Sequence, residues 1–329
     1  MFLAGDVGGT KTILGVFARA PGRPRSVRTE SFRTLDYPDL ISIAREFLSQ
    51  ARVDPREIER ACFGVAGPVE NGRAKLTNVP WVVDAEDVCR QLPVTRTHVI
   101  NDLEAMAWGV PVLEPAEVAV LWAGDPDPAA GMSLIAAGTG LGVALLPKVG
   151  GRFAPTASEG GHVDFAARTD DEERLRRALT AEFGRAEIEQ VLSGPGLYNI
   201  QRLAYPHVCE SLAKVDTPSD MPPAISEGAL SGRCEQCRAA LKLFVSCYGA
   251  CAGNLVLTAM STGGVFLGGG IAPRILQALK WPVFLESFFA KAPLEHVLRR
   301  TPVSVILNPT TGLIGAATFA MVASDDLAV

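Results

Sequence analysis

Two short glycine-rich turns carry residues whose types and spacing could bind a phosphate. The first is Gly5-Asp6-Val7-Gly8-Gly9-Thr10-Lys11 and the second is Gly138-Thr139-Gly140. A Gly-Gly-Thr turn can present successive backbone N–H groups and a hydroxyl to an anion. A carboxylate such as Asp6 can reach a phosphate-bound Mg²⁺ directly or through water. The first turn therefore favours phosphate binding together with a metal ion.

The first turn is not a Walker A P-loop. That motif needs glycine where Thr10 stands and a helix after it, whereas residues 12–17 predict a strand. The alternative without a ligand is that Gly8 and Gly9 only supply the positive φ of a hairpin turn. A third glycine-rich segment lies at residues 263–273. Three such segments in one chain are harder to explain as simple turns than a single one, which weakens this alternative.

The elements that must hold these turns alternate between strands and helices. Apolar, β-branched runs flank both turns and predict two hairpins about 130 residues apart, at 2–17 and 133–146, which suggests two related lobes. Helical periodicity at about 38–51 and short strands at 60–65 and 97–100 predict an α/β layer fold.

The second half of the chain is predicted to be mainly helical. We expect helices over 172–192 and 234–262, the first ended by Ser193-Gly194-Pro195-Gly196. Residues 263–273 predict a buried strand that runs into a helix, with Pro273 in the first helical turn.

Length and composition bound the class of protein. The 329 residues exceed the roughly 250–300 that one core usually serves, so two domains are expected. A net charge of −5 without a polybasic run disfavours nucleic-acid partners. The longest apolar stretch, 132–147, is interrupted and shorter than the ~18 residues of a spanning helix, and Asp6 comes too early for a signal peptide. The odd number of cysteines, 7, predicts reduced thiols and a cytoplasmic location without a membrane partner.

Six motifs in chain order resemble bacterial glucokinases. They are Gly5-Asp6-Val7-Gly8-Gly9-Thr10, Leu76-Thr77-Asn78 with Trp81, Asn101-Asp102, Gly138-Thr139-Gly140-Leu141-Gly142, Glu159-Gly160-Gly161-His162 and Leu192-Ser193-Gly194-Pro195-Gly196-Leu197. The resemblance runs from Gly5 to residues 312–315 and implies the two-lobed, actin-like (ribonuclease H-like) α/β sugar-kinase fold with a central cleft. The implied division is a small domain of residues 1–110 plus 308–329 and a large domain of residues 111–307.

The resemblance also implies the activity and the donor site. It implies ATP-dependent phosphorylation of glucose at the 6-hydroxyl, giving glucose 6-phosphate and ADP at the first step of glycolysis, by a cytoplasmic homodimer. ATP would be held by two phosphate hairpins and an adenosine element at 268–271, and Mg²⁺ by Asp6. The implied ATP-binding residues are Gly5, Asp6, Val7, Gly8, Gly9, Thr10, Lys11, Gly138, Thr139, Gly140, Gly269 and Gly270. Lys11 stands where many close glucokinases carry an amide, and its ammonium group could add a positive charge to the phosphate site.

The resemblance assigns catalysis to Asp102. A sugar hydroxyl is a poor nucleophile, and a carboxylate within about 3 Å can accept its proton as the O–P bond forms. The implied sugar ligands are Asn78, Asn101, Asp102, Glu159, His162 and Glu189. From the residues alone, Asp102 could instead be a helix N-cap and Glu189 part of a solvated helix face.

Several of these residues also fit other chemistry. Glu159, His162 and Asp164 are residue types that bind metals. Related kinases of the repressor and open-reading-frame group carry a Cys-rich zinc cluster soon after the corresponding His. Only Cys209 stands between His162 and Cys234 in this sequence, which disfavours such a zinc site. The pair Cys234 and Cys237 lacks a second Cys-x-x-Cys or a His-rich partner, so we interpret both as incidental thiols. Trp81 favours a core position.

Three alternative functions follow from the same residues. A kinase for another hexose or amino sugar, such as mannose or an N-acetyl sugar, would use similar hydroxyl contacts. A sugar-responsive regulator would carry a DNA-binding domain ahead of the first hairpin, where only four residues precede Gly5. An actin-like ATPase would share the hairpins but have no need for the Glu-Gly-Gly-His and Asn-Asp motifs.

Overall fold

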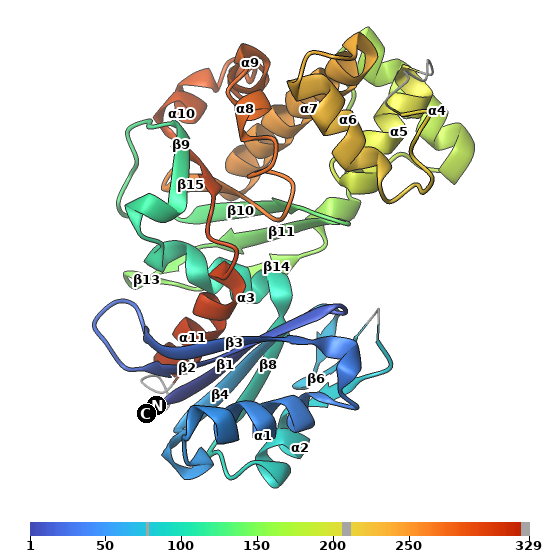
Figure 1. The fold of residues 1–329 in the computed structure, drawn as a ribbon. Helices are drawn as coiled ribbons and strands as arrows, with labels where there is room; N and C mark the ends of the chain where they lie inside the picture. Colours follow the sequence, from blue (N-terminus) through green and yellow to red (C-terminus); the bar gives the residue numbers. More distant parts are fainter. Residues whose placement is uncertain (77–78, 206–211, 324–329) are drawn as a thin grey trace. The chain divides into compact units, whose positions relative to one another are not determined.

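The chain divides into two compact units in the computed structural model, each with its own sheet (Figure 1). Unit 1 comprises Met1–Pro115, Pro155–Ala157 and Asn308–Val329, and unit 2 comprises Ala116–Ala154 and Ser158–Leu307. The structure describes residues 1–76, 79–205 and 212–323.

Unit 1 is built on a five-stranded sheet of order β3-β2-β1-β4-β8. Its strands are β1 (Phe2–Val7), β2 (Lys11–Ala18), β3 (Arg25–Arg33), β4 (Arg60–Val65) and β8 (Thr97–Asn101). β1 and β2 are antiparallel, with Val7 opposite Thr12, so the predicted first hairpin is confirmed. β4 and β8 continue the sheet in parallel. A smaller sheet holds β5 (Val69–Glu70), β6 (Arg73–Lys75) and β7 (Val82–Asp84), and the short 3-10 helices are η1 (Thr34–Asp36), η2 (Pro55–Glu57), η3 (Val110–Val112) and η4 (Pro115–Glu117).

Helices cover both faces of this sheet, as Figure 1 shows. α1 (Leu40–Ala51) and α2 (Ala85–Gln91) lie on one face, and α3 (Asp102–Gly109) and α11 (Thr311–Ala323) on the other. α3 and α11 approach closely because Gly315 has no side chain, since an added Cβ would lie 1.7 Å from the carbonyl oxygen of Ala105. This tight packing holds α3 against α11 at Ala105 and Gly109.

Unit 2 is built on a six-stranded sheet of order β14-β11-β10-β15-β16-β9. Its strands are β9 (Val118–Trp122), β10 (Met132–Ala137), β11 (Leu141–Leu146), β14 (Thr156–Ser158), β15 (Gly264–Gly268) and β16 (Val303–Ile306), and β12 (Lys148–Val149) pairs with β13 (Arg152–Phe153). β10 and β11 form the predicted second hairpin, and β10 pairs with β15 in parallel. The same arrangement of hairpin and parallel neighbour occurs in both units, so the predicted repetition is confirmed.

The helices of unit 2 gather beside this sheet (Figure 1). They are α4 (Asp170–Phe183), α5 (Gly194–Ala204), α6 (Met221–Leu230), α7 (Glu235–Ala259), α8 (Leu276–Leu279), α9 (Pro282–Phe289) and α10 (Glu295–Arg300), with 3-10 helices η5 (Gly160–His162) and η6 (Ile188–Gln190). α7 has the length and apolar composition of a membrane span, but 72% of its apolar window is buried inside the unit, where it packs against α5, α6 and α9. It therefore serves as the core helix of unit 2.

Two predicted helix boundaries are wrong. The helix expected over 172–192 ends at Phe183, because Gly184 adopts a left-handed conformation with φ +80° and caps it. The Ser-Gly-Pro-Gly motif begins a helix instead of ending one: the Ser193 hydroxyl accepts a hydrogen bond from the Gly196 N–H at 3.0 Å, and Pro195 stands in the first turn of α5.

The helix predicted directly after the third glycine site is also misplaced. Gly269 takes φ +79° at the end of β15, and residues 269–275 form turns before α8 begins at Leu276. Pro273 therefore lies ahead of the helix and not in its first turn.

Candidate functional site

The tip of the β1–β2 hairpin is held by buried hydroxyl groups. The Thr34 hydroxyl donates to the Gly8 carbonyl oxygen at 2.8 Å, and it lies 2.9 Å from the Thr12 hydroxyl, which must then be the donor to it. The Thr34 N–H donates to the Thr10 carbonyl oxygen at 3.1 Å. Thr34 thus holds the carbonyl groups of Gly8 and Thr10 in place, so the turn keeps one shape.

The sequence-predicted residues of this hairpin divide by accessibility. Thr10 and Lys11 are exposed, and Gly8 and Gly9 are half-buried. Gly5 and Val7 are buried within β1, with Val7 0% exposed. The structure therefore leaves the turn, and not the strand before it, available to a ligand.

Asp6 is the charged residue at the end of β1. Its pKa is raised from 3.8 to about 6, mainly by burial and also by the negative charge of Asp102, while the nearby Lys11 acts in the opposite direction. Its carboxylate also lies against the first turn of α11, because a Cβ added to Gly312 would be 3.1 Å from Asp6 Oδ2. A partly desolvated carboxylate beside a second carboxylate is a place where a bound cation would be stabilised.

Asn101, and not Asp102, caps α3. The Asn101 Oδ1 accepts hydrogen bonds from the N–H groups of Leu103 at 2.9 Å and Glu104 at 3.4 Å, while its Nδ2 donates to the Gly67 carbonyl oxygen at 3.1 Å. The interpretation of Asp102 as the N-cap is wrong. The Asn101 amide retains one N–H for a ligand, so it could donate to a hydroxyl but has little capacity left to accept from one.

Asp102 is the first residue of α3 and its side chain is exposed. Desolvation by the surrounding protein raises the pKa of its carboxyl group, and hydrogen bonds from backbone N–H groups, including that of Leu103, partly oppose the rise. The carboxylate is exposed although it accepts from the Leu103 N–H, so it remains accessible to a ligand. A raised pKa brings a carboxylate closer to the range in which it accepts a proton efficiently near neutral pH.

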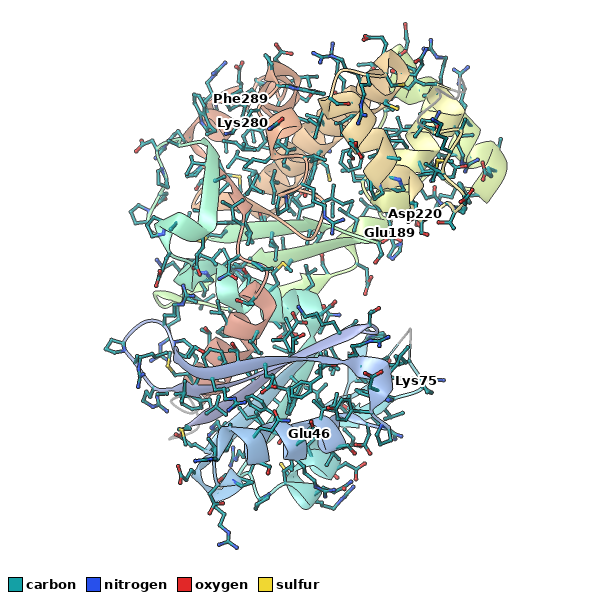
Figure 2. The ribbon with its side chains drawn as sticks, viewed as in Figure 1. Glu46, Lys75, Glu189, Asp220, Lys280 and Phe289 are labelled. Atoms are coloured by element: carbon teal, nitrogen blue, oxygen red, sulfur yellow. The ribbon has the colours of Figure 1, made fainter. Side chains whose placement is uncertain are left out.

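In unit 2, Glu189 is bound to the β10–β11 hairpin. Its Oε2 accepts a hydrogen bond from the Leu141 N–H at 2.8 Å, and Figure 2 labels it at the tip of this hairpin. Gly140 makes the contact possible, since an added Cβ would lie 2.6 Å from the same oxygen. Glu189 is half-buried in η6 and is not on a regular helix, so the alternative of a solvated helix face is wrong.

Glu159 precedes η5 as its N-cap and His162 is the last residue of η5, which packs against β11. The Glu159 side chain is 91% exposed, and its Oε2 lies 3.9 Å from His162 Nε2, beyond hydrogen-bond distance. His162 Nδ1 lies 3.3 Å from Oε2 of Glu187, a residue to which the sequence assigns no role. Nothing in the sequence pattern signals this pairing, because the two residues stand on separate segments.

The arrangement differs from the metal site considered for Glu159, His162 and Asp164. The ligand atoms that lie within 4.8 Å of one another belong to His162, Glu187 and Glu189. Asp164 instead forms an ion pair with Arg185 at 3.3 Å. The carboxylates and the imidazole at this place are also the acceptor and donor types that hydroxyl groups of a sugar require.

A cavity of 510 Å³ lies beside the third glycine site. Its walls include Leu197 from α5, Pro222 and Leu230 from α6, and Ile271 and Ile275 after Gly269-Gly270. The Gly194 N–H donates to the Gly138 carbonyl oxygen at 2.8 Å, and a Cβ on Gly194 would lie 3.8 Å from Pro222 Cγ. The mostly apolar cavity therefore adjoins the second hairpin, and its size suits a nucleoside.

Three other sequence-based assignments have different outcomes. Asn78 lies outside the described residues. Trp81 is 5% exposed, which confirms its core position. Cys234 is the N-cap of α7, with its sulfur accepting a hydrogen bond from the Cys237 N–H at 3.3 Å, so this thiol has a structural role.

Comparisons with known proteins show what this chain is similar to. The family model described as glucokinase matches residues 3–323. The chain is 37% identical to the glucokinase of Nostoc sp. (strain PCC 7120 / SAG 25.82 / UTEX 2576), over 96% of this chain and 98% of that protein. It is 35% identical to the glucokinase of Yersinia enterocolitica, over 96% and 95%.

Solved structures show the same architecture. A glucokinase from an Antarctic psychrotroph superposes with a TM-score of 0.87 at 30% identity, covering 97% of this chain and 98% of that one. A ROK family glucokinase from Streptomyces griseus, solved in complex with glucose and AMPPNP, superposes with a TM-score of 0.64 at 20% identity, covering 97% and 98%. These similarities confirm the predicted actin-like sugar-kinase fold.

Proposed function

The chain belongs to the glucokinase family, and on that premise we propose that it transfers the γ-phosphoryl group of ATP to the 6-hydroxyl of glucose with Asp102 as the general base. The observation that carries the role of Asp102 is its exposure: Asn101 is the N-cap of α3, and the Asp102 carboxylate, which also accepts from the Leu103 N–H at 2.9 Å, is exposed and available to a substrate. The products are glucose 6-phosphate and ADP.

In the proposed step, Asp102 accepts the proton of the 6-hydroxyl as the sugar oxygen attacks the γ-phosphorus. The O–P bond to the sugar forms while the bond between the γ-phosphorus and the bridging oxygen of ADP breaks, in line with it. The raised pKa of Asp102 makes its carboxylate a stronger proton acceptor than an ordinary aspartate. Asn101 can donate one N–H to a neighbouring hydroxyl.

Unit 2 contributes the remaining sugar contacts in this proposal. Glu159 presents an exposed carboxylate, His162 an imidazole nitrogen, and Glu189 the carboxylate oxygen that the Leu141 N–H does not bind. Carboxylates accept hydrogen bonds from hydroxyl groups, and an imidazole can donate or accept. Asn78, from unit 1, completes the proposed set.

The donor is proposed to bind through the hairpins and the cavity of unit 2. The adenosine part fits the apolar 510 Å³ cavity beside Gly269 and Gly270, which adjoins residues 138–140 through Gly194. The phosphates are proposed to contact residues 138–140 and the turn at residues 8–11. Asp6 fits Mg²⁺, because its carboxylate is partly desolvated and interacts with the negative charge of Asp102, so a cation would be stabilised there. Bound there with ATP, the ion would neutralise phosphate charge.

We propose a homodimer and a cytoplasmic location. Both proposals rest on membership of the glucokinase family. Light scattering coupled to size-exclusion chromatography measures the oligomeric state, and a mass near that of one chain would contradict the dimer.

The activity is tested with a panel of hexoses and amino sugars, ATP and Mg²⁺, by measuring ADP release against a control without sugar. Glucose is expected to give the highest kcat/KM. A folded protein that binds nucleotide but is accelerated by none of the sugars would refute the kinase assignment, and a higher value for mannose or an N-acetyl sugar would refute the assignment of glucose.

Substitutions of Asp102 test its role. Asp102→Asn and Asp102→Ala should each lower kcat by at least ~10²-fold, the low end for a positioned base. Both should unfold close to the wild-type temperature because neither removes the cap, whereas Asn101→Ala should cost ~1 kcal/mol of stability. Near-wild-type turnover in Asp102→Asn would exclude the general-base role.

A further inference from the structure

The segments that carry His162 and Glu187 are joined by their backbones. The Ile188 N–H donates to the Val163 carbonyl oxygen at 3.0 Å, and the Phe165 N–H donates to the Ala186 carbonyl oxygen at 3.0 Å. These bonds form an isolated antiparallel bridge between Asp164 and Glu187. The bridge begins directly after His162 and contains Glu187, so the spacing between the two side chains is set by backbone hydrogen bonds.

Glu187 is also fixed at its own end of the bridge. Its N–H donates to the Gln190 Oε1 at 3.2 Å, and the Gln190 N–H donates back to its carbonyl oxygen at 3.2 Å. Its side chain is 17% exposed, and its Oε2 accepts from Arg185 Nη2 at 2.5 Å as well as facing His162. A carboxylate held in this way by an arginine accepts hydrogen bonds and has no proton of its own to donate.

Glu187 Oε2 lies 3.3 Å from His162 Nδ1, and its negative charge favours a proton on that nitrogen over a proton on Nε2. In a neutral imidazole, the other nitrogen then carries a lone pair. His162 Nε2 lies on the side of Glu159, whose carboxylate also accepts hydrogen bonds. Two neighbouring acceptors suit two neighbouring hydroxyl groups that both donate.

We propose that Glu187 is a positioning residue for sugar binding: it holds the His162 ring in one orientation and in the Nδ1–H tautomer, so that Nε2 accepts a hydrogen bond from a sugar hydroxyl. This inference rests on the proposed function of the site. A purely structural role, in which Glu187 serves only its ion pair with Arg185, predicts no dependence of the His162 tautomer on Glu187.

The direct test is nuclear magnetic resonance of the sugar-free protein labelled with [¹⁵N]histidine, at a pH where the ring is neutral. Long-range ¹H–¹⁵N spectra distinguish a protonated from an unprotonated ring nitrogen, and the His162→Gln variant assigns the signals among the 4 histidines. The wild type should show a protonated Nδ1 on His162, and Glu187→Ala should shift the ring toward the Nε2–H tautomer. An Nε2–H tautomer in the wild type, or an Nδ1–H tautomer unchanged in Glu187→Ala, overturns the proposal.

Kinetics provide the second test. Glu187→Ala should raise the KM for the sugar about 3- to 10-fold, the effect of one lost hydrogen bond, and change kcat and the KM for ATP by less than about twofold. Glu187→Gln keeps an acceptor for Nδ1–H and should restore most of the sugar KM. Equal rises in the sugar KM and the ATP KM would contradict a sugar-positioning role.

Asp164→Ala is the matched control. Asp164 stands opposite Glu187 in the same bridge and pairs with the same Arg185, but it is not the partner of His162. The Asp164→Ala variant should keep the His162 tautomer and the sugar KM near those of the wild type. If it changes either of them as much as Glu187→Ala does, the effect comes from the backbone bridge and not from the Glu187 carboxylate. If the wild type phosphorylates no hexose, the proposed function fails while the tautomer measurement still decides the role of Glu187, so the two failures are distinguishable.

Discussion

Replacement of Asp6 by asparagine should stabilise the protein at neutral pH while impairing catalysis. Burial and, to a smaller extent, the charge of Asp102 together raise the pKa of Asp6 from 3.8 to about 6 in the folded state. Between these two values the folded protein binds more protons than the unfolded chain, so stability falls as pH rises through this window. Above it, the ionised Asp6 is a constant cost that the neutral amide of Asp6→Asn does not carry.

The size of this cost follows from the pKa difference. A difference of about 2 corresponds to about 3 kcal/mol, at 1.36 kcal/mol for each tenfold change in proton affinity. Asp6 is half-buried, so water screens part of the interaction and reduces the expected gain for Asp6→Asn to about 1–2 kcal/mol above about pH 7. Below about pH 4 the gain should approach zero, because the carboxyl group is then neutral in both states.

The assay is urea unfolding of the wild type and Asp6→Asn at intervals from about pH 4 to about pH 8. The difference between the two proteins cancels the titration of the other groups. Asp36→Asn, at an exposed position of unit 1, measures the effect of removing a surface charge alone. Asp102→Asn should move the window to lower pH, because it removes one cause of the raised pKa of Asp6. A stability difference between Asp6→Asn and wild type that does not change with pH would refute this reasoning.

The remaining predictions concern unit 2. Gly140→Ala should raise the sugar KM more than Gly138→Ala in steady-state assays. The Cβ added at Gly140 would lie 2.6 Å from the Glu189 carboxylate, whereas a Cβ added at Gly138 would meet nothing within 4 Å. Equal rises in the sugar KM would contradict this. Cys234→Ala should lose ~1 kcal/mol in thermal unfolding by removing the cap of α7, and Cys234→Ser should retain most of it. Arg168→Ala should lower the free energy of unfolding by ~3–5 kcal/mol in urea unfolding, because it leaves the fully buried Glu172 carboxylate without its arginine partner. A decrease below ~1 kcal/mol would show that water or another group replaces the arginine.

The sequence by itself determined the two hairpins and the residue types at their turns. The alternation of apolar, β-branched residues around glycines is a local pattern, and both hairpins follow it in the structure. The Asn101-Asp102 junction between strand and helix was predictable for the same reason. The motifs also identified the family, because they recur in order along the chain.

Local patterns could not decide which residue performs each task at a helix end. Asn101 and Asp102 are both good capping residues, and the choice of Asn101 depends on its backbone conformation and on its bond to Gly67 from another loop. Ser193-Gly194-Pro195-Gly196 can end or begin a helix. Because α4 already ends at Gly184, the Ser-Gly-Pro-Gly motif begins the next helix, α5.

Only the tertiary structure decided the electrostatic state of the site residues. The raised pKa of Asp6 depends on burial and on Asp102, which a different strand and helix bring near it. The pairing of His162 with Glu187 depends on a backbone bridge between two segments that a 14-residue helix separates in the chain. Desolvation and hydrogen bonding act between atoms that are close in space, and sequence spacing sets that closeness only within one helix, strand or turn.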